Sequence, residues 1–203
     1  MNLYMAFLII SVVFIATPGP NVLAIVSTGF RHGRLRALQT VVGTTLAMSI
    51  QLAVAAMGTV WFVHAFSEGY RILKWAGIAY FLLLGVRHIK KSFSSHQAPA
   101  QTSALASVFT GFAVSLSNPK TILFFSAFLP QFVESQAHYR YEIVILSVSF
   151  LGIAVLIDAS YAILSARAGR LLAGNRVAAL HERLTGLLYV AAGLWLAISR
   201  RTQ

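Results

Sequence analysis

The chain has 203 residues, of which 58% are hydrophobic and only 10% are charged, and its mean hydropathy is +0.75. A soluble domain of this size usually carries about 25% charged residues, so the composition excludes an ordinary soluble enzyme and indicates a polytopic membrane protein. The chain contains no cysteine, which excludes disulfide scaffolds, cysteine nucleophiles and thiolate metal sites.

The net charge of +11 comes from 16 basic and 5 acidic residues. Because the basic residues lie between apolar segments and form no continuous stripe, we assign them to loops that orient the protein in a membrane. A nucleic-acid partner is not expected. Membrane lipids are the expected surroundings.

Six apolar segments approach or exceed the length of about 20 residues that a transmembrane helix needs. In chain order they cover about residues 3–27, 40–63, 72–89, 105–129, 143–164 and 184–198. The third reaches across only if the flanking Lys74 and Arg87 extend to the headgroups. The pattern predicts an all-α polytopic membrane protein that forms a single transmembrane domain over residues 1–203.

The distribution of Lys and Arg predicts the orientation of these six segments. The loops after the first, third and fifth segments hold ten basic residues, and the opposite side holds five. Basic loops stay in the cytoplasm. We therefore expect those three loops inside the cell and both termini outside.

The second half of the chain repeats motifs of the first half in the same order. TPGPN at residues 17–21 corresponds to SNPKT at 117–121, and Pro18 and Pro119 lie 101 positions apart. Further matches pair Gly43 with Gly152, Gly77 with Gly186, Tyr80 with Tyr189, and Gly85 with Gly193. We interpret residues 1–90 and 105–203 as two repeats, separated by a polar loop at about 90–104. Since each repeat has three spans, the two would lie inverted in the membrane.

The two proline motifs are the first candidate binding site. A proline inside a helix removes a backbone hydrogen bond, and in hydrocarbon the freed groups need other partners. Freed N–H groups suit a carboxylate and freed carbonyls suit an ammonium group, so a matched pair of breaks could hold a zwitterion. The alternative is a pair of plain kinks without a ligand. The candidate residues are Thr17, Pro18, Gly19, Pro20, Asn21, Asn118 and Pro119.

Lys120 and Asp158 are the fixed charges deepest in the predicted spans. Intramembrane charges are costly unless they are paired or functional. Lys120 could hold a substrate carboxylate, and Asp158 could accept an ammonium group or carry a proton. A purely structural ion pair between them is the alternative. Gln51 and the glycines at 77, 85, 186 and 193 are expected to serve helix packing.

The sequence as a whole resembles the LysE/RhtB family of amino-acid exporters. The resemblance rests on FIATPGPNVLAIVSTGFRHGRLRAL in the first span, on SNPKTILFF at the start of the second half, and on the length and six spans. It implies export of an amino acid or derivative across the bacterial inner membrane, with proton coupling as the expected drive. The resemblance implies that the family's functional positions correspond to residues 18–21, to Asn118, Pro119 and Lys120, and to Asp158.

Two other function classes remain to be weighed. An uncoupled, channel-like facilitator for small polar solutes would also fit the spans. A membrane-embedded enzyme would need a nucleophile–base pair or a metal cluster, and the spacing offers neither, so no enzyme activity, cofactor or metal is expected. The histidines show no metal-ligand spacing, and no phosphate-binding glycine loop is present. A homo-oligomer is compatible with the sequence, and the solute and the coupling ion stay open.

Overall fold

The computed structural model describes residues 3–56, 75, 78–90, 102–134, 136–171 and 175–198. Within these ranges the regular structure is entirely helical, which confirms the predicted all-α class. The main helices are α1 (Leu3–Ala16), α2 (Pro20–Ala56), α4 (Ala104–Leu116), α5 (Pro119–Leu123), α6 (Tyr139–Leu171) and α7 (Asn175–Ile198). Residues 78–90 are also helical. The π-helix η1 (Phe124–Phe128) and the 3-10 helices η2 (Leu129–Phe132) and η3 (Gln136–His138) connect α5 to α6.

Both proline motifs interrupt helices at the predicted positions. The first break separates α1 from α2, which begins at Pro20. Proline is well suited to the first helical position, because the N–H that it lacks would have no helical partner there. Pro20 therefore starts a helix and does not interrupt one. The second break separates α4 from α5, whose N-cap is Asn118 and whose first residue is Pro119.

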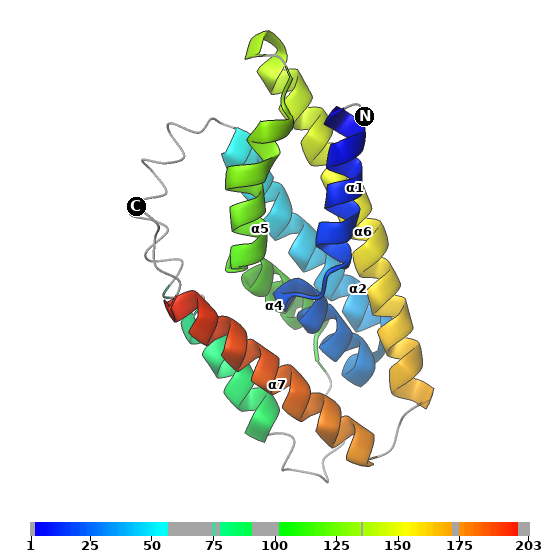
Figure 1. The fold of residues 1–203 in the computed structure, drawn as a ribbon. Coiled ribbons are helices and arrows are strands. Elements are labelled where there is room, and N and C mark those ends of the chain that lie inside the picture. Colours follow the sequence, from blue (N-terminus) through cyan, green and yellow to red (C-terminus); the bar gives the residue numbers. More distant parts are fainter. Residues whose placement is uncertain are drawn as a thin grey trace.

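Helix α2 is two helices joined at Gly33. This glycine has φ 79° and ψ −179°, a backbone conformation that favours glycine, and α2 bends there into a V (Figure 1). The first arm continues the first predicted span, and the second arm begins the second span. Of the described helices, α2 and α6 are long and apolar enough to cross a membrane. Residues 57–63 of the second predicted span, and most of residues 72–77 in the third, lie outside the described ranges.

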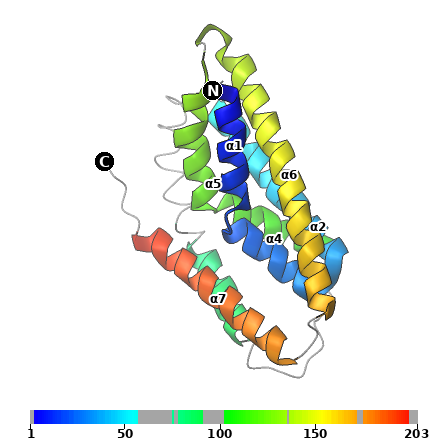
Figure 2. The ribbon, with the colours of Figure 1, turned by 45° about the vertical axis from the view of Figure 1, so that its right-hand side comes forward.

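The main bundle consists of α1, α2, α4, α6 and the segments from α5 to η2. In Figures 1 and 2, α1 descends while α4, α5 and η1 rise beside it, so the two broken segments run in opposite directions. Phenylalanine rings dominate the core between α1, η1 and α6: the centroids of Phe124 and Phe150 are 5.2 Å apart, and those of Phe125 and Phe150 are 4.9 Å apart. The outward faces remain apolar, with Val148 64% and Leu156 71% exposed. Such faces are expected where lipid surrounds a protein.

The helix over residues 78–90 and α7 form a second unit, which leans against the main bundle (Figures 1 and 2). A Cβ built at Gly85 would lie 2.9 Å from the carbonyl oxygen of Gly186, and the reverse distance is also 2.9 Å. The prediction of close helix packing at these two glycines is confirmed. This unit meets the bundle through a buried apolar cluster of Ala24, Ile78, Phe81, Val114 and Tyr189.

Gly43 and Gly152, which the repeat pairs with each other, differ in their surroundings. A Cβ at Gly43 would collide with the α4 backbone at Val108 and Phe112, whereas a Cβ at Gly152 would meet nothing within 4 Å. The contact between α2 and α4 therefore depends on the missing side chain at Gly43.

We predict that Gly43→Ala lowers stability by about 1–3 kcal/mol, because the new methyl group forces two backbones apart. Gly152→Ala is the matched control and should leave stability unchanged or raise it, because alanine is the better helix former. Thermal unfolding of the two purified variants in detergent measures the difference. Equal melting temperatures would contradict the prediction and show that α2 and α4 accommodate the added methyl group without loss of stability.

Candidate functional site

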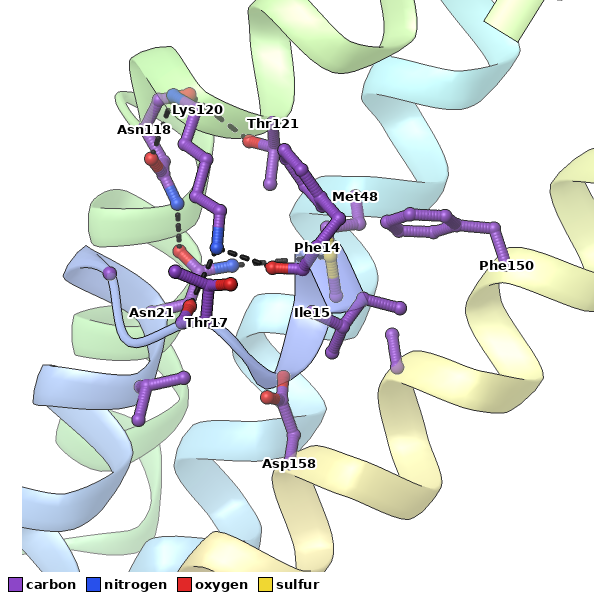
Figure 3. A pocket seen from close by; sticks show the side chains of 13 residues that line it. Phe14, Ile15, Thr17, Asn21, Met48, Asn118, Lys120, Thr121, Phe150 and Asp158 are labelled. Carbon is purple, nitrogen blue, oxygen red and sulfur yellow. Dashed lines mark hydrogen bonds between the residues drawn. The ribbon is translucent and has the colours of Figure 1, made fainter. Parts of the chain in front are cut away.

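A small cavity lies where the two helix breaks meet (Figure 3). Its volume of about 30 Å³ is room for about one or two water molecules. Its lining comes from both breaks, from the second arm of α2 and from α6. The lining residues are Phe14, Ile15, Thr17, Gly19, Asn21, Val22, Met48, Asn118, Lys120, Thr121, Phe150, Ala154 and Asp158.

A hydrogen bond between two asparagines joins the breaks. The amide nitrogen of Asn118 donates to the side-chain oxygen of Asn21 at 2.8 Å, and the amide of Asn21 donates to the hydroxyl of Ser115 at 3.1 Å. The Asn118 side-chain oxygen also accepts from the backbone N–H of Lys120 at 3.0 Å. Gln51 donates to the carbonyls of Ser115 and Leu116 at 3.1 and 3.2 Å. The groups freed at the second break are thus paired by side chains from α2 and the break itself.

Lys120 provides the partner for the carbonyls freed at the first break. Its Nζ donates to the carbonyl oxygens of Phe14 at 2.5 Å and Thr17 at 2.6 Å. The same ammonium group lies 4.4 Å from the centroid of the Phe14 ring, a favourable cation–π distance. Gly19 leaves room for the lysine, because a Cβ there would lie 3.2 Å from Lys120 Cδ. Each half of the chain therefore satisfies polar groups of the other.

Asp158 reaches the cavity from α6 and is only 3% exposed. Figure 3 shows its carboxylate on the side of the cavity away from the Lys120 ammonium group. Lys120 instead contacts backbone carbonyls, so the alternative of a structural Lys120–Asp158 ion pair is not realised in this structure.

The cavity brings together most of the predicted residues. Thr17, Gly19, Asn21, Asn118, Lys120 and Asp158 all line it. Pro18 and Pro20 lie in the first break and at the start of α2, and Pro119 begins α5, so these prolines shape the backbone. The Thr17 hydroxyl donates to the carbonyl of Val13 at 2.7 Å, within its own turn.

Three polar contributors were not among the candidates. Ser115 accepts from Asn21, Gln51 holds two carbonyls of the break, and Thr121 lines the cavity. Gln51 was expected to bond between helices, and this is confirmed, because it joins α2 to the end of α4. Across the described part of the chain no three His, Asp or Glu side chains lie close enough to hold a metal ion.

The family follows from comparison with known proteins. Residues 12–200 match the model of the LysE type translocator family. The chain belongs to this family. It is therefore a membrane transporter and not an enzyme, in agreement with both the resemblance and the polar break sites.

Individual relatives are distant but cover much of the chain. A homoserine/homoserine lactone efflux protein of Salmonella typhimurium is 26% identical over 97% of both chains. A leucine efflux protein of Klebsiella pneumoniae is 26% identical over 66% of this chain and 65% of its own. A membrane protein of Pseudomonas aeruginosa is 31% identical over 74% and 70%. No solved structure matches the chain.

We predict that the Asn21–Asn118 pair couples the two breaks energetically. In a double-mutant cycle, Asn21→Ala and Asn118→Ala should be non-additive by about 1 kcal/mol, because each single change already removes the shared hydrogen bond. The measurement is the free energy of unfolding in mixed micelles. The control cycle pairs Thr17→Val with Asn118→Ala and should be additive, because the Thr17 hydroxyl bonds only within its own turn. Additivity in both cycles would contradict the coupling.

Proposed function

We propose that the protein is a secondary transporter that exports amino acids or amino-acid derivatives across the bacterial inner membrane in exchange for protons. The observation that carries this proposal is the meeting of two broken helices at a cavity lined by one ammonium group and one carboxylate, Lys120 and Asp158. The names of the homoserine and leucine efflux relatives support the substrate class.

The two charged groups suit the two ends of a zwitterion. Lys120, together with backbone N–H groups at the break, would take the carboxylate, and Asp158 would take the ammonium group. In this structure Lys120 Nζ is held by the carbonyls of Phe14 and Thr17. Substrate binding would draw the lysine away from these carbonyls. The hydrogen bonding of the first break would therefore depend on whether a solute is bound.

Asp158 can also link export to proton entry into the cell. It is the one acidic side chain among the described residues that line the cavity, and a carboxylate cannot hold a proton and pair with an ammonium group at the same time. Competition between the proton and the solute's ammonium group for Asp158 would give antiport, because the site would change from one side of the membrane to the other with only one of them bound.

Alternating access fits the arrangement of the two halves. The broken segments run in opposite directions (Figures 1 and 2), each is interrupted near a proline, and a polar pair joins the breaks. These features support two inverted three-span repeats with the solute site between them. The cavity of about 30 Å³ is smaller than an amino acid, so the solute would bind in a conformation that opens to one side.

The test of this function is exchange of labelled homoserine and leucine in proteoliposomes. Lys120→Met should slow exchange about 10- to 100-fold, the effect of removing a hydrogen bond to a charged group. Asp158→Asn should keep exchange at a raised half-saturation concentration but lose export driven by a proton gradient. Neither change breaks an ion pair, because the two side chains are not paired. Lys120→Met does remove the partner of the Phe14 and Thr17 carbonyls, so exchange is measured on protein that elutes from a sizing column as the unmodified protein does. The control Arg170→Gln changes an exposed charge at the end of α6 and should behave like the unmodified protein.

Two results would count against this function. Export by the unmodified protein that ignores collapse of the proton gradient would favour the uncoupled facilitator. Exchange at the normal rate in Lys120→Met would remove the lysine from the solute site.

Topology gives a separate prediction. Reporter fusions after Ser95 and Gly174 should report the cytoplasm, and fusions after Gln136 and Gln203 the outside, because the loops with most Lys and Arg stay in the cytoplasm. A cytoplasmic signal from the fusion at Gln203 would contradict the inverted six-span arrangement. Paired alkaline-phosphatase and green-fluorescent reporters measure both sides.

A further inference from the structure

A second and much larger cavity lies between the main bundle and the second unit, which consists of residues 78–90 and α7. Its volume is about 840 Å³, many times that of the cavity at the breaks. The walls come from the first arm of α2, residues 78–90, α4 and α7. Basic side chains from two of these elements gather on it: Arg31, His32, Arg87, His88 and Lys90.

The charged side chains among the described residues of this wall are all basic. Three side chains with fixed positive charge line it, and none of the described residues that line it is acidic. Hydroxyl groups make up much of the remaining wall, and those of Ser27, Thr28, Ser107 and Thr110 donate to backbone carbonyls within their own helices. The basic side chains are therefore the groups that would hold carboxylate or phosphate oxygens.

The opposite end of the molecule has the contrary charge. A cavity of about 390 Å³ there is lined by Glu134 and Glu142 and by no basic residue in the described chain. The positive cavity is thus a local feature and not a consequence of the chain's overall charge. It lies at the end where the loops with most Lys and Arg gather, which the orientation rule places in the cytoplasm.

A thin apolar layer separates the positive cavity from the break site. Tyr189 lines the cavity and is 1% exposed, and its ring packs against Phe81 at 6.1 Å between centroids. Ala24 and Val114 complete the layer. Ala24 lies about one helical turn from Asn21, and Val114 directly precedes Ser115, so the layer adjoins the hydrogen bond between Asn21 and Ser115.

We propose that the cavity is a cytoplasm-facing vestibule that captures the carboxylate of the outgoing solute before the solute passes the Phe81–Tyr189 layer to the break site. This inference rests on the proposed export function. It also narrows the substrate class: the vestibule favours neutral or acidic amino acids and disfavours dibasic ones. Because the carboxylate is the captured group, neutral amino acids with different side chains should compete for the vestibule about equally, and dibasic ones less well.

The experiment uses the absence of cysteine in the natural chain, because one introduced thiol is then a unique reporter. Ala106 is exposed, lines the vestibule and contributes no side-chain hydrogen bond. Ala106→Cys in inside-out vesicles is treated at low salt with sulfonatoethyl or trimethylammonioethyl methanethiosulfonate, which are anionic and cationic. Ala137→Cys is exposed at the opposite end, which the same orientation rule places outside, so it is labelled in right-side-out vesicles and gives the intrinsic preference between the two reagents.

The anionic reagent should be favoured at residue 106 at least fivefold relative to residue 137. Arg87→Gln should lower that preference at least twofold, since one unit charge at about 8 Å in water changes the local concentration of a monovalent ion about twofold. Arg170→Gln, the matched control, should leave it unchanged. An equal preference at residues 106 and 137, or no effect of Arg87→Gln, would overturn the proposal.

Competition tests the captured group. Leucine should slow modification at residue 106 and leucinamide, which lacks the carboxylate, should not. Equal protection by both, or by neither, would contradict carboxylate capture. The measurement is made in phosphatidylcholine vesicles with and without phosphatidylglycerol; protection that depends on phosphatidylglycerol alone would mean that the cavity binds a lipid phosphate. Thiol reactivity does not require transport, so failure here is distinct from failure of export.

Discussion

A helix that breaks inside a membrane must find partners for the backbone groups that it frees, because hydrocarbon offers none. This constraint organises the centre of the molecule. The carbonyls freed at the first break are held by Lys120 from the second half, and the second break is held by Asn21 and Gln51 from the first half. At each break, some backbone carbonyls find their hydrogen-bond partners only in the other half of the chain. The two halves are therefore tied together at the place where a transporter must move.

This reciprocal arrangement explains how an apolar chain can keep a polar centre without a permanent ion pair. The Lys120 ammonium group is neutralised in part by carbonyl dipoles and the Phe14 ring, and the buried Asp158 lies separately on α6. Lys120 and Asp158 do not bond to each other, and the proposed function assigns one of them to each end of the solute. The vestibule and the apolar layer above it then supply a route from one side of the membrane to these groups.

Local sequence rules located the breaks but not their partners. Proline and N-cap preferences depend on neighbours along the chain, so Pro20, Asn118 and Pro119 could be placed from the sequence. The close approach at Gly85 and Gly186 followed from matched spacing. The contact of Lys120 with Phe14 and Thr17 joins residues more than 100 positions apart, and the different roles of Gly43 and Gly152 depend on which helix lies opposite. Such facts arise from tertiary packing and have no signature within one segment.

The π-helical turn at Phe124–Phe128 has a consequence for the second half of the chain. A π turn contains one more residue than an α turn, so its conversion to α geometry would advance the following residues by about 1.5 Å and rotate them by about 100°. Leu129 is fully buried, and the Phe132 ring packs against Phe7 of α1 at 5.3 Å between centroids. A change of register in this one turn would exchange the side chains that face α1 while Pro119 and Lys120 kept their places.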